Sequence, residues 1–333
     1  MWKVAPALVA GNTVVMKPAE LTPATCALLV EVLEEAGLPP GCLQLVVGPG
    51  SEVGNAITAN PDIKAVSFTG SNQIGYALYA QAAARGAKVT CELGGKNAVI
   101  VLPGADLDAV VPAVLNGAFG STGQRCTATS RVLAHPDIMG QLTEAVVAGA
   151  KALKVGPGLD EASQMGPAVD KKQHAQDLMY VDVAKKEGAR LLTGGGVPKG
   201  LDQGYFVEPT VFEGVRAEHR LFKEEVFGPV LALTPIKDLS EGIKLANAVE
   251  YGLTCSLYSR DVNDVMRFVE EVETGMVHVN EPTVGGEAQL PFGGLKATGI
   301  GGREMSTDGL EFFTETKTVF INYTGKAERS FVR

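Results

Sequence analysis

The chain has 333 residues, of which 45% are hydrophobic, and its 29 Lys and Arg against 38 Asp and Glu give a formal net charge of −9. This length suits two domains or one large domain with a buried core, and the composition excludes a disulfide-stapled mini-protein as well as a disordered or fibrous chain. No dense basic run is present to neutralise a phosphate backbone, so we expect no nucleic-acid partner.

The first hundred residues alternate short strands with helices. A helix is expected to begin after Thr22, a good N-cap followed by Pro23, and to end near 37–40, where Gly and Pro terminate helices. Further helices are expected to open at Ser51 and Ser71. Strands are predicted at 13–16, 43–47, 63–68, 89–92 and 97–102. Strand–helix–strand units of this length predict a mostly parallel, doubly wound α/β sheet.

The same alternation continues beyond residue 100 and predicts a second α/β layer. Helical patterns lie at 106–118, 138–153, 168–187, 238–249 and 261–272, and strand-like runs at 130–134, 229–234, 253–259 and 275–280. The turn-rich segment 94–97 is the expected boundary between the two layers. Residues 315–323 alternate as a strand would.

Cysteine and histidine usage restricts the compartment and the kind of site. The five cysteines form no C-x-x-C pair and predict neither a disulfide framework nor a zinc ribbon, which fits a reducing, cytoplasmic compartment. The four histidines lack metal-ligand spacing, so no metal site is expected. The apolar stretch between Lys3 and Lys17 is interrupted by Pro6 and Gly11 and is too short to cross a membrane, so no membrane partner is expected.

Two residues could carry covalent chemistry. Cys126 lies in the segment 120–127, GSTGQRCT, where glycines permit a close backbone approach and Arg125 is expected to lower the pKa of the thiol. Read alone, this cysteine is either a nucleophile or a small buried hydrophobic residue. Glu92 ends the predicted strand 89–92 and precedes two glycines, so it is either a general base or a solvated turn carboxylate.

Two turns could hold a ligand. The turn after the predicted strand 63–68 opens a helix, whose free N–H groups suit a phosphate, although many such turns bind nothing. Its candidate residues are Gly70, Ser71 and Gly75. The end of the first strand carries Lys17, Pro18 and Glu20, which could reach ribose hydroxyls or form a surface ion pair.

Taken together, these segments resemble the NAD(P)-dependent aldehyde dehydrogenase superfamily from about Trp2 to the C-terminal end. The motifs are long, ordered and independent: AGNTVVMKPAE at 10–20, FTGS at 68–71 with Gly75, ELGGKN at 92–97, GQRC at 123–126, EVFGPV at 225–230 and PFGGLK at 291–296. The resemblance implies an incomplete Rossmann-type cofactor domain over 1–94 and an α/β catalytic domain over 95–300. Residues 301–333 would return to the cofactor domain and end in an oligomerisation strand.

The resemblance also implies a mechanism. Cys126 would attack the aldehyde carbon, hydride would pass to NAD, with NADP also possible, and Glu92 would activate the water that hydrolyses the thioester. The backbone N–H of Cys126 would be one oxyanion donor. Glu20 would repel a 2′-phosphate, which favours NAD. The implied cofactor-binding residues are Lys17, Pro18, Glu20, Gly70, Ser71, Gly75, Leu93, Gly94, Glu225 and Phe227.

The family pattern also has a segment before the position of Trp2, with the first strand of the cofactor fold and an asparagine that is the second oxyanion donor. The resemblance therefore indicates an N-terminally shortened member. Two functions stay open: a working aldehyde dehydrogenase, or a weakened homologue that keeps cofactor or partner binding or only a thiol-dependent esterase activity. An exposed sheet edge would need covering, so a homodimer or homotetramer is expected.

Arg125 bears on the identity of the aldehyde. A guanidinium beside the nucleophile offers a planar fork for a carboxylate or phosphate. The GQRC motif is similar to that of members that oxidise semialdehydes of dicarboxylic acids or phosphorylated aldehydes. An oxo-acid semialdehyde comes first because no second basic cluster for a phosphate is evident. The alternative is that Arg125 braces its loop through a carboxylate and leaves a pocket for neutral aldehydes.

Overall fold

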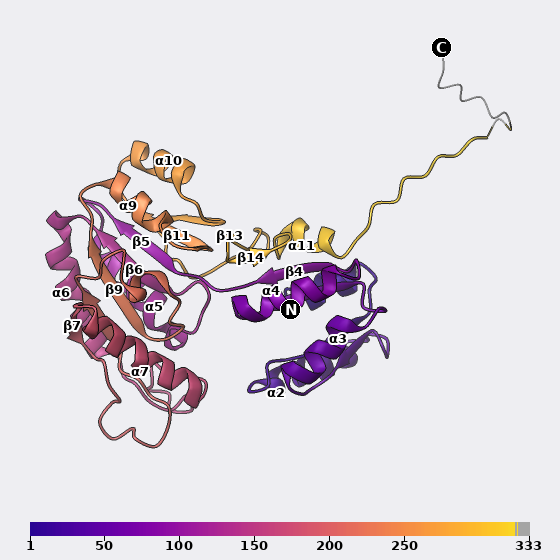
Figure 1. Ribbon diagram of the computed structural model, residues 1–333, viewed down its shortest axis with the longest axis horizontal. Helices are drawn as coiled ribbons and strands as arrows, with labels where there is room; N and C mark the ends of the chain where they lie inside the picture. The colour runs from indigo at the N-terminus through magenta and orange to yellow at the C-terminus, as the bar shows by residue number, and fades with distance from the viewer. Residues whose placement is uncertain (324, 326–333) are drawn as a thin grey trace, which may run out of the picture.

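The computed structural model describes residues 1–323 and 325, and their strands form four sheets. Figure 1 shows two α/β parts, with the chain up to the end of β4 (Lys88–Glu92) in one and most of the later residues in the other. The C-terminal part of the domain expected over 301–333 lies outside the described residues from 326 onward and at 324. The α/β fold class is confirmed.

The N-terminal part contains two small sheets. One pairs two parallel strands, β1 (Val14–Met16) and β2 (Leu43–Leu45). The other has three strands in the order β14 (Gly299–Ile300), β4 (Lys88–Glu92) and β3 (Ala65–Thr69), with β14 antiparallel to β4. The helices of this part are α1 (Val4–Val9), α2 (Pro23–Glu35), α3 (Asn55–Ala59) and α4 (Asn72–Ala83), and a π-helical turn, η1 (Gly50–Gly54), precedes α3.

The larger part is built on a seven-stranded sheet in the order β12-β11-β5-β6-β9-β8-β7, in which only the β7–β8 pair is antiparallel. Its strands are β5 (Asn97–Val101), β6 (Thr129–Ala134), β7 (Arg190–Thr193), β8 (Thr210–Glu213), β9 (Val230–Pro235), β11 (Thr254–Tyr258) and β12 (Met276–Val279). A two-stranded ribbon pairs β10 (Tyr251–Gly252) with β13 (Leu295–Lys296).

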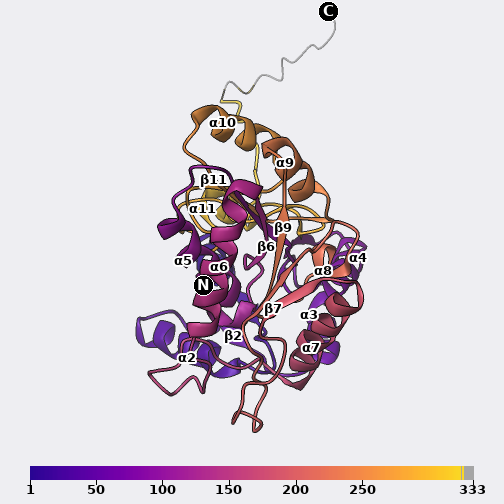
Figure 2. The ribbon, with the colours of Figure 1, turned by 90° about the vertical axis from the view of Figure 1, so that its left-hand side faces the viewer.

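Helices cover both faces of the seven-stranded sheet (Figure 2). One core cluster packs beneath α5 (Leu107–Phe119) and α6 (Pro136–Ala152). The other packs beneath α7 (Lys171–Lys186), α9 (Leu239–Asn247) and α10 (Val262–Glu271), and includes residues of α8 (Arg220–Lys223). Because both faces are covered, the central strand β5 contains a continuous apolar run, in which Val99, Ile100 and Val101 are fully buried.

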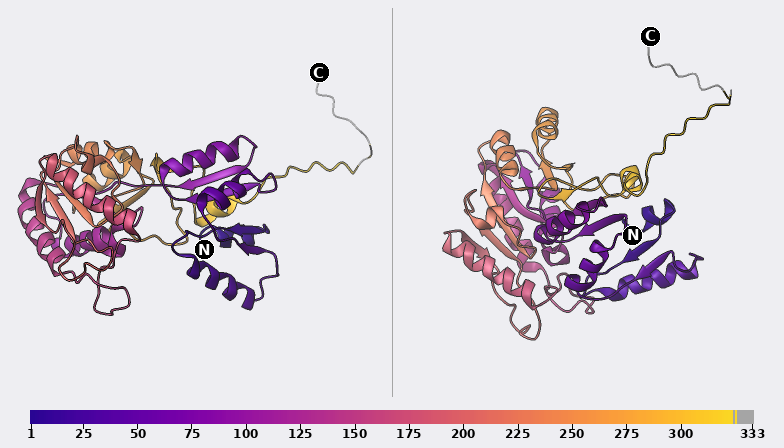
Figure 3. Two further views of the ribbon diagram at one scale, coloured as in Figure 1. Left: turned by 60° about the horizontal axis from the view of Figure 1, so that its bottom comes forward. Right: turned by 45° about the vertical axis from the view of Figure 1, so that its right-hand side comes forward.

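The chain passes from the N-terminal part to the larger part and later returns. Residues 93–96 pass from β4 in the small sheet to β5 in the large one, where the sequence predicts a boundary. The chain later returns, and α11 (Ser306–Phe312) packs near α1 in the N-terminal part (Figure 3). The division into domains itself stays a prediction.

The predicted strand at 315–323 is not a strand in this structure. These residues extend away from the body of the molecule (Figure 1), and no strand is assigned to them. A strand is defined by its ladder with a neighbour, and the described residues offer no neighbouring strand here. Val319 and Ile321 are accordingly exposed. The expected oligomerisation role of this segment stays a prediction.

Most other predicted elements are confirmed within a few residues, and the misses are short. The helix expected at Ser51 begins instead as the π-turn η1 and becomes α-helical only from Asn55. Eight short elements were not predicted: α1, α8, α11, β7, β8, β10, β13 and β14. No helix in the described part of the chain is long and apolar enough to cross a membrane.

Candidate active site

The loop that carries Cys126 has a forced backbone conformation. It follows α5 as a 3-10 turn, η2 (Gly120–Gly123), in which Ser121, Thr122 and Gly123 have φ of 52°, 60° and 67°. A Cβ on Gly123 would lie 2.3 Å from the carbonyl oxygen of Gly228, so close packing as well as a positive φ requires glycine there. The loop therefore presents Cys126 from a backbone that surrounding contacts hold in place.

A hydrogen bond to the backbone of Cys126 holds this residue in place. Its carbonyl oxygen accepts a hydrogen bond of 2.7 Å from Nδ2 of the buried Asn97, the first residue of β5. Backbone hydrogen bonding at Thr127 and Cys126 acts to lower the pKa of the thiol. Burial raises the pKa of the Cys126 thiol to about 11, and the carboxylates of Glu225 and Glu92 add to the increase. At neutral pH the resting group is thus a protonated thiol.

The expectation that Arg125 would lower the pKa of this thiol is wrong. The Arg125 side chain is exposed, and its Nε donates to the Ser121 hydroxyl at 3.0 Å. Burial and two carboxylates dominate the pKa of the Cys126 thiol. The brace that holds Arg125 is a hydroxyl of its own loop and not the carboxylate that the alternative proposed.

Glu92 is a buried carboxyl at the carboxyl end of β4, so the solvated-turn alternative does not hold. Its side chain is 5% exposed, and its Oε2 has no hydrogen-bond partner among the described residues. Burial raises its pKa to about 8, and the nearby Glu304 adds to this, whereas Lys3 and Arg303 oppose it. A carboxyl that titrates near neutrality suits proton transfer at working pH.

Lys3 and Glu304 form an ion pair beside Glu92 that sequence analysis missed. The two residues are 301 positions apart, and Oε1 of Glu304 also accepts from the Ser67 hydroxyl at 3.3 Å. Trp2 packs on the ring of Phe292 at 5.0 Å between centroids, which ties the start of the chain to the same late loop. No local spacing in the sequence marks such a pair.

Glu225 lies in the turn between α8 and β9, next to the glycines that follow Glu92. Its Oε1 accepts from the backbone N–H of Gly95 at 2.8 Å, and a Cβ on Gly94 would lie 2.6 Å from its Oε2. Burial raises the pKa of the Glu225 carboxyl, and the Gly95 hydrogen bond opposes the increase. Two residues on, the exposed Phe227 has φ of 60°. The structure thus brings Glu225, Glu92 and Cys126 together.

The remaining predicted cofactor residues surround the two small sheets. Lys17 Nζ donates to the carbonyl oxygens of Pro18 and Gly48, and Oε1 of Glu20 accepts from the Gly50 N–H, so Lys17 and Glu20 do not form the surface ion pair that was the alternative. Gly70 and Ser71 precede α4, and Ser71 is its N-cap but makes no side-chain cap hydrogen bond. A Cβ on Gly75 would meet the buried Leu93 side chain at 2.4 Å, so these two residues pack on each other.

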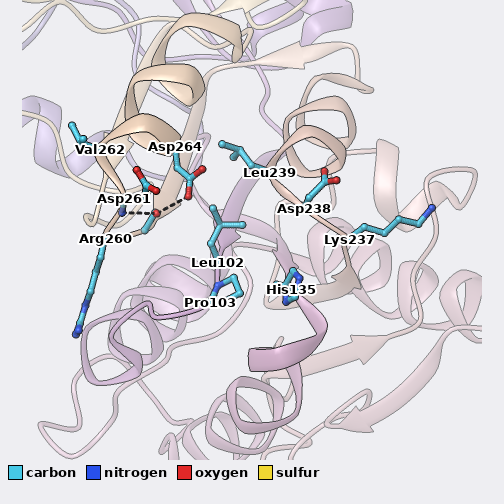
Figure 4. A pocket seen from close by; sticks show the side chains of 11 residues that line it. Leu102, Pro103, His135, Lys237, Asp238, Leu239, Arg260, Asp261, Val262 and Asp264 are labelled. Carbon is cyan, nitrogen blue, oxygen red and sulfur yellow. Dashed lines mark hydrogen bonds between the residues drawn. The ribbon is translucent and has the colours of Figure 1, made fainter.

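A separate hollow of about 760 Å³ lies at the carboxyl ends of β5, β6, β9 and β11 (Figure 4). Ser259 links its acidic residues, because its hydroxyl donates to Asp264 and accepts from the Asp261 N–H. The side chains of Arg260 and Lys237 extend away from the centre of the hollow. None of the predicted site residues lines it, so it is distinct from the Cys126 site.

The matching family model is the aldehyde dehydrogenase family, over residues 1–319. The chain belongs to this family. Similar curated proteins are the 2,5-dioxopentanoate dehydrogenase of Saccharolobus solfataricus, 48% identical over 96% of this chain and 67% of that protein, and the alpha-ketoglutaric semialdehyde dehydrogenase of Bacillus subtilis, 45% identical over 96% and 66%. The chain thus spans about two thirds of the length of these relatives.

Solved structures of aldehyde dehydrogenases share the fold. The Mycobacterium tuberculosis aldehyde dehydrogenase complexed with NAD+ superposes with a TM-score of 0.92 at 41% identity, covering 98% of this chain and 66% of that one. Betaine aldehyde dehydrogenase from Staphylococcus aureus, in complex with NAD+, gives 0.90 at 37% identity, with the same coverage. Membership of the aldehyde dehydrogenase family confirms the resemblance on which the sequence analysis rested.

Proposed function

We propose that this aldehyde dehydrogenase family member oxidises an aldehyde to a carboxylic acid with NAD+, using Cys126 as nucleophile and Glu92 as general base. One observation carries the proposal: Gly95, three residues after Glu92, contacts both other groups, because its N–H donates to Glu225 Oε1 at 2.8 Å and a Cβ on it would lie 2.3 Å from the Cys126 carbonyl oxygen. A nucleophile, a base and an oxyanion site together are what acyl chemistry at a carbonyl requires.

In this proposal, protons move between Cys126, Glu92 and water. Because the pKa of the Cys126 thiol is about 11 and that of Glu92 about 8, ionised Glu92 is the base that can accept the thiol proton. The backbone N–H of Cys126 would then donate to the oxygen that becomes negative when sulfur bonds to the aldehyde carbon. Glu92 releases the thiol proton to solvent before the second half, in which it takes a proton from the water that attacks the thioester. The acid then leaves, and the Cys126 thiolate takes up a proton to return to the thiol.

The residues present fit NAD+. The first N–H groups of the 12-residue helix α4 are open to a phosphate, since the Ser71 side chain does not cap them. The carboxyl of Glu225, fixed by Gly95, suits a ribose hydroxyl. When bound, NAD+ supplies the acceptor for the substrate hydride. We propose a preference for NAD+ over NADP+, because the Lys17 ammonium is turned to the carbonyl oxygens of Pro18 and Gly48 and does not pair with Glu20.

We propose a semialdehyde of an oxo acid as substrate. The exposed Arg125 guanidinium is next to the nucleophile and forms no ion pair within the described residues, so it has donors to spare for a carboxylate. The names of the two curated relatives, 2,5-dioxopentanoate and alpha-ketoglutaric semialdehyde dehydrogenase, agree with this substrate class. Arg125→Leu should then lose about 1.5–3 kcal/mol in kcat/KM for an anionic semialdehyde and almost nothing for a neutral aldehyde of equal length. An equal loss for both would reject the anion-binding role.

Cofactor reduction, followed by absorbance with a panel of aldehydes, tests the reaction itself. Wild-type protein should reduce NAD+, Cys126→Ser should not, and Glu92→Gln should slow both the acylation of Cys126 and the hydrolysis of the acyl-enzyme, so that steady-state NAD+ reduction is largely lost. Turnover that survives Cys126→Ser would reject the nucleophile assignment. Ester hydrolysis without any NAD+ reduction would favour the thiol-esterase alternative.

A further inference from the structure

The turn that carries Glu225 and Phe227 is strained and therefore needs support. Phe227 has φ of 60°, a left-handed conformation that a bulky L-residue rarely adopts. Such a backbone persists only where the surroundings over-determine it. The Glu225 carboxyl, which we propose binds a ribose hydroxyl of NAD+, lies two residues before Phe227 and depends on the same turn for its position.

Two glutamine side chains of α7 supply this support. Nε2 of Gln173 and Nε2 of Gln176 donate to the carbonyl oxygen of Val226, at 3.0 and 2.9 Å. This carbonyl belongs to the peptide that leads into Phe227, so the two donors fix the orientation of the strained peptide. We call Gln173, Gln176 and Asp177 the α7 brace.

Asp177 determines which way the Gln173 amide faces. Its Oδ1 accepts from the same Gln173 Nε2 at 2.7 Å, so one amide hydrogen goes to Asp177 and the other to the Val226 carbonyl. With the amide reversed, its oxygen would face the oxygens of Asp177 and Val226. The carboxyl also lies directly under the turn, because a Cβ on Gly228 would be 2.0 Å from Asp177 Oδ1.

Burying a carboxyl at position 177 costs free energy of folding. Asp177 is 0% exposed, and its Oδ2 has no hydrogen-bond partner among the described residues. Burial raises the pKa of the carboxyl to about 7, against the effect of the Gln173 hydrogen bond. An apolar residue of similar size would avoid the desolvation penalty. The carboxyl is explained if the fold needs its acceptor and not merely its volume.

We propose that Asp177 is a positioning residue for the cofactor site, which orients Gln173 so that the α7 brace holds the turn carrying Glu225 and Phe227. The inference rests on the proposed function, in which Glu225 binds NAD+. The carbonyl oxygen of Gly228 in the same turn also packs against Gly123, so the brace lies behind the nucleophile loop as well.

Three variants test the brace. Asp177→Val keeps the shape and removes the acceptor, Asp177→Asn restores a neutral acceptor, and Asp182→Val makes the same change at an exposed position of α7. Calorimetric titration should show that Asp177→Val weakens NAD+ binding at least about tenfold, that Asn recovers most of the affinity, and that Asp182→Val matches wild type. The melting temperature of Asp177→Val should be unchanged or higher, and cofactor-free hydrolysis of p-nitrophenyl acetate should stay within about twofold of wild type.

Hydrogen exchange separates the brace from the cofactor assignment. Backbone amides in the peptide spanning 224–228 should exchange faster in Asp177→Val than in wild type or Asp182→Val, with no ligand present. Unchanged exchange would overturn the brace, as would NAD+ affinity equal to wild type. Faster exchange in a protein whose wild type binds no NAD+ would keep the brace and reject the proposed function. Falling stability and esterase rate together with lost affinity would make Asp177 merely structural.

Discussion

Glu92→Gln should change the pH dependence of stability as well as the chemistry. The pKa of Glu92 rises from 4.5 to about 8 on folding, so the folded state holds this proton more tightly than the unfolded chain does. The resulting stabilisation is full below pH 4.5 and is lost as the pH rises through 8. A shift of this size corresponds to about 5 kcal/mol of lost folding free energy at pH 9 and about 2 kcal/mol at pH 6. Gln cannot ionise and escapes this loss.

Thermal unfolding at several pH values measures the effect. Glu92→Gln should melt several degrees above wild type at pH 9, and the difference should shrink steadily toward pH 5. Glu144→Gln, an exposed carboxyl on α6, is the control and should follow wild type throughout. Parallel melting curves for Glu92→Gln and wild type between pH 5 and 9 would refute the claim that Glu92 is buried with a raised pKa.

Two further substitutions probe the surroundings of the site. Lys3→Met removes the cation that opposes the raised pKa of Glu92. The pH at which acyl-enzyme hydrolysis speeds up should therefore move to a higher value. Lys88→Met, at the other end of β4, is the control and should leave this pH unchanged. A shift to lower pH would contradict this role. Gly123→Ala must place a Cβ at positive φ against backbone oxygens and should destabilise the protein by at least about 2 kcal/mol, while Gly140→Ala, in a helix with open space, should stabilise it by up to about 1 kcal/mol. Equal melting temperatures for the two alanine variants would refute the forced conformation.

Local patterns were sufficient for the central elements of the fold. The apolar run of β5 and the Thr22-Pro23 start of α2 belong to short stretches of chain, so the sequence reveals them directly. The misses have a common cause. β10 and β13 have two residues each and exist only because positions 251–252 and 295–296 meet in the fold, and no short window contains both partners.

The candidate site could likewise be predicted only in part. Cys126 and Glu92 stand in recognisable motifs, so their positions could be predicted, but their titration could not. The sequence suggested that Arg125 would lower the pKa of the Cys126 thiol. Burial raises this pKa instead, and so do two carboxyls that are far from Cys126 in the sequence but near it in the fold. The ion pair of Lys3 and Glu304, which joins residues 301 positions apart beside Glu92, is likewise a product of tertiary packing.

A protonated resting thiol is compatible with fast turnover. Moving the proton from Cys126 to Glu92 crosses from a pKa of about 11 to one of about 8, which costs about 4 kcal/mol. A reaction with about ten turnovers per second has a total barrier of about 16 kcal/mol, so this step leaves most of the barrier to the bond-making chemistry. The same burial that raises both pKa values also keeps the sulfur from existing as an exposed thiolate, the form that oxidants attack. In the proposed mechanism, proton transfer to Glu92 therefore takes up a small part of the barrier, and Cys126 becomes reactive mainly when Glu92 is ionised.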